Sequence, residues 1–311
     1  MFEVFSSTLS QMLVMFLFIV IGYILNKAKI LPKDTSNALS KLENYCLVPA
    51  LVMSNFMNNC TIENISKKYT LIIYSICILA VALIISLLIA GVFTKDPYQK
   101  NVYKYALTFG NFSFMGTAVI KAIYDDDMLF NYLMFVLPLN LLVYTWGIVI
   151  LIPKKSGVNP LKNLINPVFI GMILGALIGI LNLQDYIPTF FKDTVSSAGA
   201  CMAPIAMILT GFVVANYELK KLILQYRVYI ATFLRLIIIP VIFILALKAI
   251  GADKTTLIVA LVAYATPLGL NTVVFPAAYG GDTTTGASMA LISHTISIIT
   301  IPIMFALFIG A

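Results

Sequence analysis

Two apolar stretches of this sequence carry residues that interrupt helices and bind polar solutes. Residues 264–282 (YATPLGLNTVVFPAAYGGD) lie in a segment long enough to cross a bilayer. Where a plain spanning helix would have Leu or Ile, this segment has Pro267, Gly269, Asn271, Thr272 and Pro276. Proline removes a backbone donor and clashes with the preceding turn, and backbone groups freed at membrane depth must be satisfied by protein or by a water-filled cavity. We therefore expect a broken helix at a solute-binding site.

A second stretch, residues 105–124 (YALTFGNFSFMGTAVIKAIY), repeats the pattern. Each stretch opens with Tyr-Ala, has a glycine four residues after the alanine (Gly110 and Gly269), and follows it closely with an asparagine (Asn111 and Asn271). An asparagine amide donates two hydrogen bonds and accepts others, and the N-terminus of a half-helix offers free amides and a positive dipole end. These groups suit an organic anion that is bound without a permanently buried charge.

The other polar residues of these stretches are weaker candidates. Ser113 and Thr272 could contact a ligand, but serine and threonine hydroxyls often bond to their own helix. Gly116, together with the two prolines, is a candidate helix-breaking position. The simpler alternative is that all these side chains only satisfy backbone groups freed by the kinks.

Three ionisable residues lie inside apolar segments: Arg235, Glu43 and His294. An intramembrane arginine is a functional candidate by default. Arg235 could attract an anion to a cavity open to the cytoplasm, or it could be a structural partner or reach the interface. Glu43 could pair with Arg235 or carry a proton. Histidine titrates near neutral pH and would suit proton coupling, but no carboxylate shares the segment of His294, so we favour a hydrogen-bonded packing role.

Composition restricts the class of protein. The 311 residues are 61% hydrophobic and 11% charged, whereas soluble domains are nearer one quarter charged. We expect one polytopic membrane domain, 1–311, without a soluble domain. The net charge of +7 does not point to nucleic acid, because the lysines lie in loops where they set topology and meet anionic lipid. Four cysteines without CxxC spacing and a single histidine give no metal site, and we expect no cofactor.

Apolar runs of about 20 residues predict ten spanning helices: 7–26, 35–57, 70–94, 102–124, 128–152, 164–183, 194–216, 225–250, 254–279 and 283–309. The first has no basic region before it and no small-residue cleavage site after it, so we expect a retained helix instead of a signal peptide. Most of the 20 Lys and Arg residues lie at connections after odd-numbered helices. The predicted topology therefore has these connections in the cytoplasm and both termini outside the cell membrane.

The Tyr-Ala, glycine and asparagine pattern of residues 105–124 recurs in residues 264–282, which indicates an internal repeat. Because five helices is an odd number, two five-helix halves, 1–155 and 156–311, would insert with opposite topology. Inverted repeats of this kind occur in secondary transporters, with the site near the midplane where broken helices meet.

The residues carry a family resemblance nearly from end to end. It rests on LSKLENYCLVPAL in the second predicted helix, GNFSFMG in the fourth, INPVFIGMILGALIG in the sixth, APIAMILTG in the seventh, and AAYGGDTTTGASMALISHTISIITIPIM across the last two. In these motifs the chain resembles the auxin efflux carrier family, in its compact bacterial form. One departure is that many relatives have a proline shortly after the glycine of the fourth helix, where this chain reads Gly116-Thr117-Ala118.

The resemblance implies an all-α fold like that of the bile-acid/sodium symporters, with ten helices in two inverted repeats. Helices 4 and 9 would be broken and cross. Helices 1, 2, 6 and 7 would form a scaffold, through which a homodimer would assemble, and helices 3–5 and 8–10 a moving transport domain. The implied function is alternating-access transport of a small organic anion, either auxin-like or a malate- or malonate-like carboxylate.

An intramembrane enzyme, a channel or receptor, and a coupled symporter are the alternatives to this function. An intramembrane serine protease would need Ser113 beside His294 and has no GxSxG motif, while the aspartates lie at helix ends; we therefore expect no enzyme. A channel or receptor is a less favoured alternative. A sodium- or proton-coupled symporter of another solute also remains open, although few carboxylates are available for a sodium site.

Overall fold

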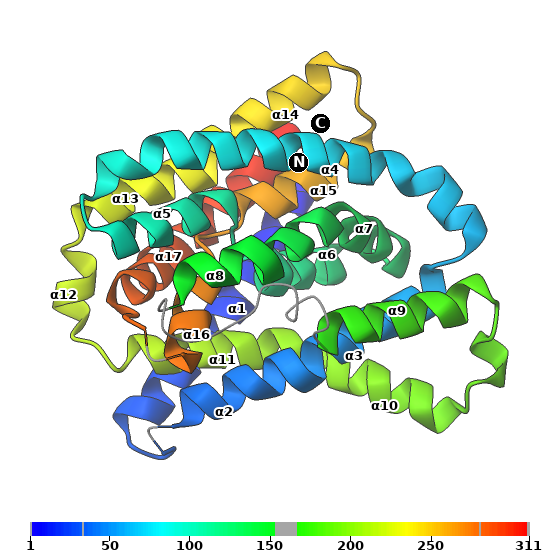
Figure 1. The fold of residues 1–311 in the computed structure, drawn as a ribbon, viewed down its shortest axis with the longest axis horizontal. Helices are drawn as coiled ribbons and strands as arrows, with labels where there is room; N and C mark the ends of the chain where they lie inside the picture. The colour runs from blue at the N-terminus through cyan, green and yellow to red at the C-terminus, as the bar shows by residue number, and fades with distance from the viewer. Residues whose placement is uncertain (1, 33, 153–166, 280, 310–311) are drawn as a thin grey trace.

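The structure is a computed structural model that describes residues 2–32, 34–152, 167–279 and 281–309. In these ranges every regular element is a helix (Figure 1). Six helices there are long and apolar enough to cross a membrane: Phe5–Lys27, Ile62–Phe93, Asp126–Leu151, Thr189–Val214, Tyr226–Ala249 and Thr284–Phe308. Shorter apolar helices cover Phe112–Ile123, Pro167–Ile180 and Lys254–Ala265. The chain is therefore a multi-pass, all-α membrane protein.

The first half of the chain begins with α1 (Phe2–Lys27). The predicted segment 35–57 forms α2 (Thr35–Leu42), a π-helical turn η1 (Glu43–Leu47) and α3 (Val48–Asn59). It is followed by α4 (Ile62–Phe93), α5 (Pro97–Thr108), the π-helical turn η2 (Phe112–Gly116) and α6 (Thr117–Ile123). Then come α7 (Asp126–Leu142), the π-helical turn η3 (Val143–Gly147) and α8 (Ile148–Leu151).

The second half begins, within the described residues, with α9 (Pro167–Ile180), a 3-10 turn η6 (Gln184–Tyr186), α10 (Thr189–Ala200) and α11 (Met202–Val214). It continues with α12 (Leu219–Ile223), α13 (Tyr226–Phe233), the π-helical turn η7 (Leu234–Ile238) and α14 (Ile239–Ala249). The last helices are α15 (Lys254–Ala265), α16 (Asn271–Ala278) and α17 (Thr284–Phe308). Residues 164–166 of the sixth predicted helix, and the predicted boundary between the repeats at 155, lie outside the described residues.

Helix α4 begins earlier than the apolar run predicts. The sequence suggests a start at residue 70 because charged residues precede it, but Thr61 caps the helix by accepting a hydrogen bond from the Asn64 amide at 3.2 Å. Glu63 and Lys67 then lie one turn apart on an exposed face and pair at 2.6 Å. The apolar run therefore marks the part of the helix that would lie in lipid, while capping sets where the helix begins.

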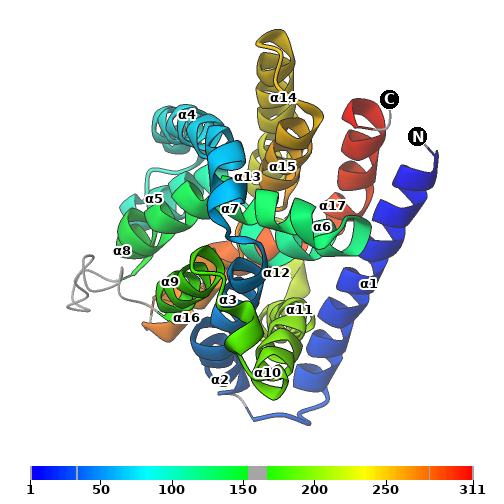
Figure 2. The same cartoon turned by 90° about the vertical axis from the view of Figure 1, so that its right-hand side faces the viewer.

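Glycines bring five helices into close contact. A β-carbon on Gly211 of α11 would lie 1.8 Å from the Ile19 carbonyl oxygen of α1, and one on Gly175 of α9 would lie 2.5 Å from the Met53 carbonyl oxygen of α3. Gly199 joins α10 to α3 in the same way. Small residues let membrane helices approach closely, and Figure 2 shows α3, α9, α10 and α11 gathered on one side of the molecule.

The connections alternate between two ends of the molecule. In Figure 1 the α1–α2 and α4–α5 connections and α12 lie at the left, while the α3–α4 and α9–α10 connections lie at the right. Helices α1 and α17 lie side by side, and the start of α1 and the end of α17 lie at the same end (Figure 2). That arrangement agrees with an even number of membrane crossings.

The close packing of α1 on α11 gives a stability prediction. Replacing Gly211 by alanine should lower the free energy of unfolding by about 1–3 kcal/mol, because the added methyl group overlaps rigid backbone. The matched control is Gly91→Ala, where the β-carbon would meet only the flexible Lys100 side chain at 3.3 Å. Thermal unfolding of both variants in detergent, followed by circular dichroism, checks this. Equal melting temperatures for Gly211→Ala and wild type would contradict the packing.

Candidate functional site

The two interrupted helices cross at their breaks. Helix α5 ends at Thr108 and α15 ends at Ala265, and after each a short extended stretch leads to the next helix. Gly110 and Leu268 form an antiparallel backbone bridge, in which the Asn111 amide donates to the Pro267 carbonyl at 2.7 Å. Four helix ends therefore meet in one place, two C-terminal and two N-terminal.

Arg235 joins the two C-terminal ends. It lies in η7 and is fully buried. Its Nη1 donates to the carbonyls of Leu107 at 3.2 Å and Thr108 at 3.3 Å, and its Nη2 donates to the Ala263 carbonyl at 3.0 Å. The last carbonyls of a helix have no partner in their own helix and carry the negative end of its dipole. The planar guanidinium therefore satisfies the ends of α5 and α15 together.

The surroundings of Arg235 are fitted to this role. The guanidinium lies over the Tyr264 ring, 4.9 Å from its centroid. A β-carbon on Gly110 would lie only 2.5 Å from the arginine Nη2, so glycine is required there. Among the described residues, the ion pairs are Lys67–Glu63, Lys68–Asp127 and Lys221–Glu218. The suggested pairing of Glu43 with Arg235 is therefore not formed, because backbone carbonyls occupy the guanidinium instead.

Asn111, at the break after α5, contacts His294 of α17. The Asn111 Nδ2 lies 2.9 Å from the His294 Nε2, and the histidine Nδ1 lies 2.7 Å from the Ala290 carbonyl oxygen. Because a carbonyl only accepts, Nδ1 carries the hydrogen and Nε2 of the neutral ring accepts from the asparagine. The Asn111 Oδ1 is buried and has no hydrogen-bond partner. His294 thus holds the asparagine by one of its donors.

Asn271, at the start of α16, donates to the Tyr105 hydroxyl at 2.9 Å. Ser113 donates to the Asn140 Oδ1 of α7 at 3.2 Å. Thr272 donates to the Gly269 carbonyl at 2.8 Å, so its hydroxyl serves the backbone beside it. The structure brings the two asparagines to the same crossing, while Ser113 faces α7.

The remaining predicted positions lie as follows. Pro267 is in the extended stretch and its carbonyl accepts the bridge hydrogen bond, whereas Pro276 lies inside α16. Gly116 ends η2, and a β-carbon there would lie 2.0 Å from the Tyr132 hydroxyl oxygen. A β-carbon on Gly269 would lie 2.8 Å from the Phe109 carbonyl oxygen, so this glycine permits the crossing itself.

Sequence reasoning missed two residues of the crossing. Ser293 of α17 accepts from the Leu268 amide at 3.1 Å and donates to the Met289 carbonyl at 2.6 Å, so it satisfies a backbone group freed by the break. Tyr105 binds Asn271. The recurrence of Tyr-Ala in both stretches singled out Tyr105 as part of the repeat without indicating its contact. Ser293 had no signal beyond its place next to His294.

A cavity of about 230 Å³ lies beside α16, the helix that follows the second break. Its walls come from α2, η1, η3, α8, the start of α9, α16 and the residue after it. The lining residues are Ser40, Lys41, Asn44, Tyr45, Tyr144, Ile148, Pro167, Val168, Val274, Phe275 and Tyr279. It therefore combines hydroxyl, amide and amine groups with an apolar wall, a mixture that suits a small amphipathic solute.

The sequence matches a known family of membrane proteins. A family model described as membrane transport protein matches residues 7–305. The chain belongs to this family, the auxin efflux carrier family. A stretch of 102 residues is also 28% identical to an uncharacterised transporter of Schizosaccharomyces pombe. That stretch is 33% of this chain and 23% of the yeast protein, so the chain spans a minor part of this relative.

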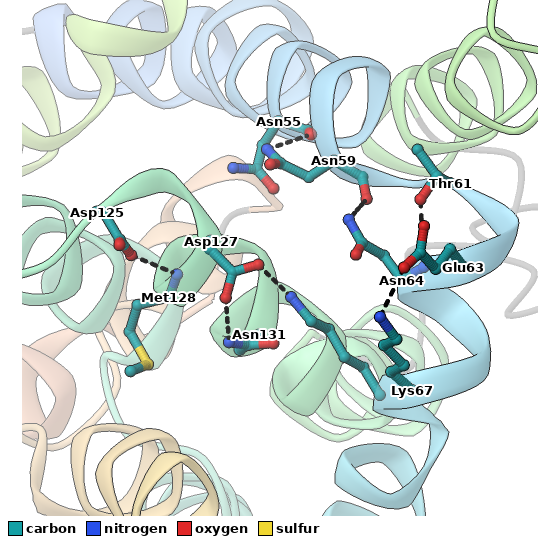
Figure 3. A network of polar contacts seen from close by, with 11 residues as sticks. Asn55, Asn59, Thr61, Glu63, Asn64, Lys67, Asp125, Asp127, Met128 and Asn131 are labelled. Atoms are coloured by element: carbon teal, nitrogen blue, oxygen red, sulfur yellow. Dashed lines mark hydrogen bonds and ion pairs between the residues drawn. The ribbon is translucent and has the colours of Figure 1, made fainter.

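A network of polar side chains lies at the end of this membrane transport protein away from the cavity (Figure 3). Lys68 of α4 pairs with Asp127 of α7, and Asn131 donates to the same carboxylate at 3.1 Å. Beside them, Asn64 donates to the Asn59 carbonyl at 2.8 Å, and Asn59 donates to the Asn55 carbonyl at 3.1 Å. The polar network ties the start of α4 both to α3 and to α7.

The double capping by Arg235 predicts a stability loss in this family member. Replacing Arg235 by leucine should lower the free energy of unfolding by at least about 2 kcal/mol, because buried carbonyls lose their donors. Arg235→Lys should recover little of it, since an ammonium lacks the planar fork that reaches both helix ends. Melting temperatures in detergent check both variants.

Arg227→Leu is the control for this prediction, because Arg227 is exposed and contacts the neighbouring Tyr226. It should melt like wild type. Full stability of Arg235→Lys would mean that charge alone, and not the span between two helix ends, is what the crossing needs.

Proposed function

We propose that this protein is a secondary carrier that moves a small organic anion across the membrane by alternating access. The observation that carries the proposal is the crossing of two interrupted helices beside a cavity of about 230 Å³. Interrupted helices at membrane depth are costly, and in carriers their ends supply the solute site.

The anion would be bound by donors at the N-termini of the two helices that follow the breaks. Each asparagine amide has two N–H donors, and Asn111 and Asn271 each use one of them, on His294 and Tyr105. The second donor of each remains for a carboxylate, which would lie near the positive dipole ends of the helices that follow. Arg235 is occupied by the opposite helix ends and offsets their negative dipoles, so the anion meets the positive side of the crossing.

The family resemblance supplies the proposed architecture. Ten spanning segments would form two inverted repeats, 1–155 and 156–311, with α5–α6 and α15–α16 as the crossing helices. The glycine contacts of α1 with α11, and of α3 with α9 and α10, support a tightly packed scaffold. The remaining helices would form the transport domain, and two copies would pair through their scaffolds in the plasma membrane.

Orientation follows from the basic residues. The ends of the molecule that carry most lysines include the α1–α2 and α4–α5 connections, so we place them in the cytoplasm and both termini outside. The cavity is lined by α2 near that end, and the polar network of Figure 3 ties α3, α4 and α7 together at the other.

Asn271→Ala tests the binding site. In proteoliposomes, counterflow of labelled malate, malonate or indole-3-acetate should be saturable for wild type and fall about 10–100-fold for the variant. The loss corresponds to one hydrogen bond to a charged group, worth roughly 1.5–3 kcal/mol. The matched control is Asn37→Ala on the exposed face of α2, which should exchange like wild type. Undiminished exchange by Asn271→Ala would remove this residue from the site.

Filling the cavity gives a second test. Val274 lines the cavity and is 3% exposed, whereas Val92 on α4 is 82% exposed. Val274→Trp should abolish counterflow because the indole occupies the space for the solute, and Val92→Trp should leave it unchanged. Both variants are first compared with wild type by gel filtration in detergent. Normal exchange by a folded Val274→Trp would mean that the solute takes another route.

A further inference from the structure

Glu43 is a buried carboxyl group without a partner. It lies in η1, its side chain is 0% exposed, and neither carboxylate oxygen has a hydrogen-bond partner. Burying an ionised carboxylate without a counter-charge or hydrogen bonds costs far more than burying the neutral acid. The surroundings therefore fit the protonated form of Glu43 in this conformation.

The elements around Glu43 supply no compensating charge. Turn η1 packs against α9, α10 and α11. Helices α9 and α11 carry no ionisable side chain, and α10 carries Lys192, which donates to the Gln184 carbonyl at 3.3 Å, and the exposed Asp193. On its own segment, Lys41 is exposed.

One further group faces Glu43 from the opposite helix. Tyr144 of η3 is near enough to interact electrostatically with the Glu43 carboxyl group, and Tyr144 also interacts with Tyr105, the partner of Asn271. Tyr144 lines the cavity, as do Ser40 and Asn44 on either side of Glu43 in the chain. The carboxyl group is thus one side chain away from both the cavity and the crossing.

We propose that Glu43 is the proton-binding group of the carrier, so that an organic anion and a proton cross the membrane together. The inference rests on the proposed function. A proton from water at one face adds to the carboxylate and forms the O–H bond, and that bond breaks when the proton returns to water at the other face. No electron moves. Because only the neutral carboxyl fits the buried position, the change of state requires the proton.

The position of Glu43 gives this coupling a physical basis. It lies on a helix of the proposed scaffold, whereas Tyr144 lies on a helix of the proposed transport domain. When the two domains move past each other, the surroundings of Glu43 change from apolar to wet while its own helix stays in place. A group whose environment changes in this way releases its proton at one stage of the cycle and binds one at another.

Glu43→Gln tests the proposal, because glutamine imitates the neutral acid and binds no proton. Proteoliposomes hold a pH-sensitive dye, the membrane potential is clamped with potassium and valinomycin, and values from protein-free liposomes are subtracted. The solute is malonate, because its dianion does not cross lipid unaided, whereas indole-3-acetic acid crosses as the neutral acid. With one proton per malonate and the potential clamped at zero, a gradient of one pH unit should give wild type a roughly tenfold accumulation. The variant should keep counterflow within about twofold, since the neutral form is preserved, and lose both accumulation and anion-dependent proton entry.

The matched control is Glu63→Gln, which removes an exposed carboxylate paired with Lys67 and should accumulate like wild type. Accumulation by Glu43→Gln equal to wild type overturns the inference. Wild-type counterflow without proton entry also overturns it and leaves the proposed function intact. Absence of counterflow with every acid counts against the proposed function instead.

A second measurement keeps the inference testable without transport. Dicyclohexylcarbodiimide reacts with protonated carboxyl groups in apolar surroundings. Mass spectrometry of wild type in detergent should find an adduct on Glu43 that weakens at alkaline pH and is missing in Glu43→Gln. An unlabelled Glu43 would overturn the inference whatever the transport assays give.

Discussion

The structure depends on how backbone groups are satisfied where two helices are interrupted inside the membrane. Each break leaves carbonyls and amides without the partners that a continuous helix provides. Arg235 takes the carbonyls of both C-terminal ends, and Ser293 takes an amide of the second break. The hydrogen bond from the Asn111 amide to the Pro267 carbonyl pairs two more. Because other groups satisfy this part of the backbone, the side chains of the two asparagines are not needed there. Each keeps one N–H donor that a solute could use.

Much of this was visible in the sequence, and the reasons are local. Pro267, Gly269 and Asn271 interrupt an apolar run, and helix-breaking chemistry acts within a few residues. The start of α4 was missed because a threonine cap is a short-range feature hidden behind a charged turn. The pairing of Arg235 with Glu43 was wrong because the acceptors of Arg235 are backbone carbonyls, which residue types do not indicate. These carbonyls lie 128 and 28 residues away in the chain.

The glycine-packed helices and the crossing differ in how they are held together. Glycines let α1, α3, α9, α10 and α11 touch backbone to backbone, which leaves few side chains to rearrange. The crossing combines a backbone bridge between Gly110 and Leu268 with side-chain hydrogen bonds from α17 and η7. The cavity has walls from α9 of the first group and from α16, which follows the second break.

Four π-helical turns interrupt helices in the described part of the chain, and three of them contain Glu43, Tyr144 and Arg235. A turn that closes over five residues inserts one residue relative to an α-helix, which rotates everything after it by about 100°. The side chains before and after each such turn therefore point in different directions. Those of one part can face lipid while those of the other part face the interior of the protein. Removing a single residue from such a turn would leave hydropathy almost unchanged, yet it would swing these polar side chains around the helix axis and out of the centre of the protein.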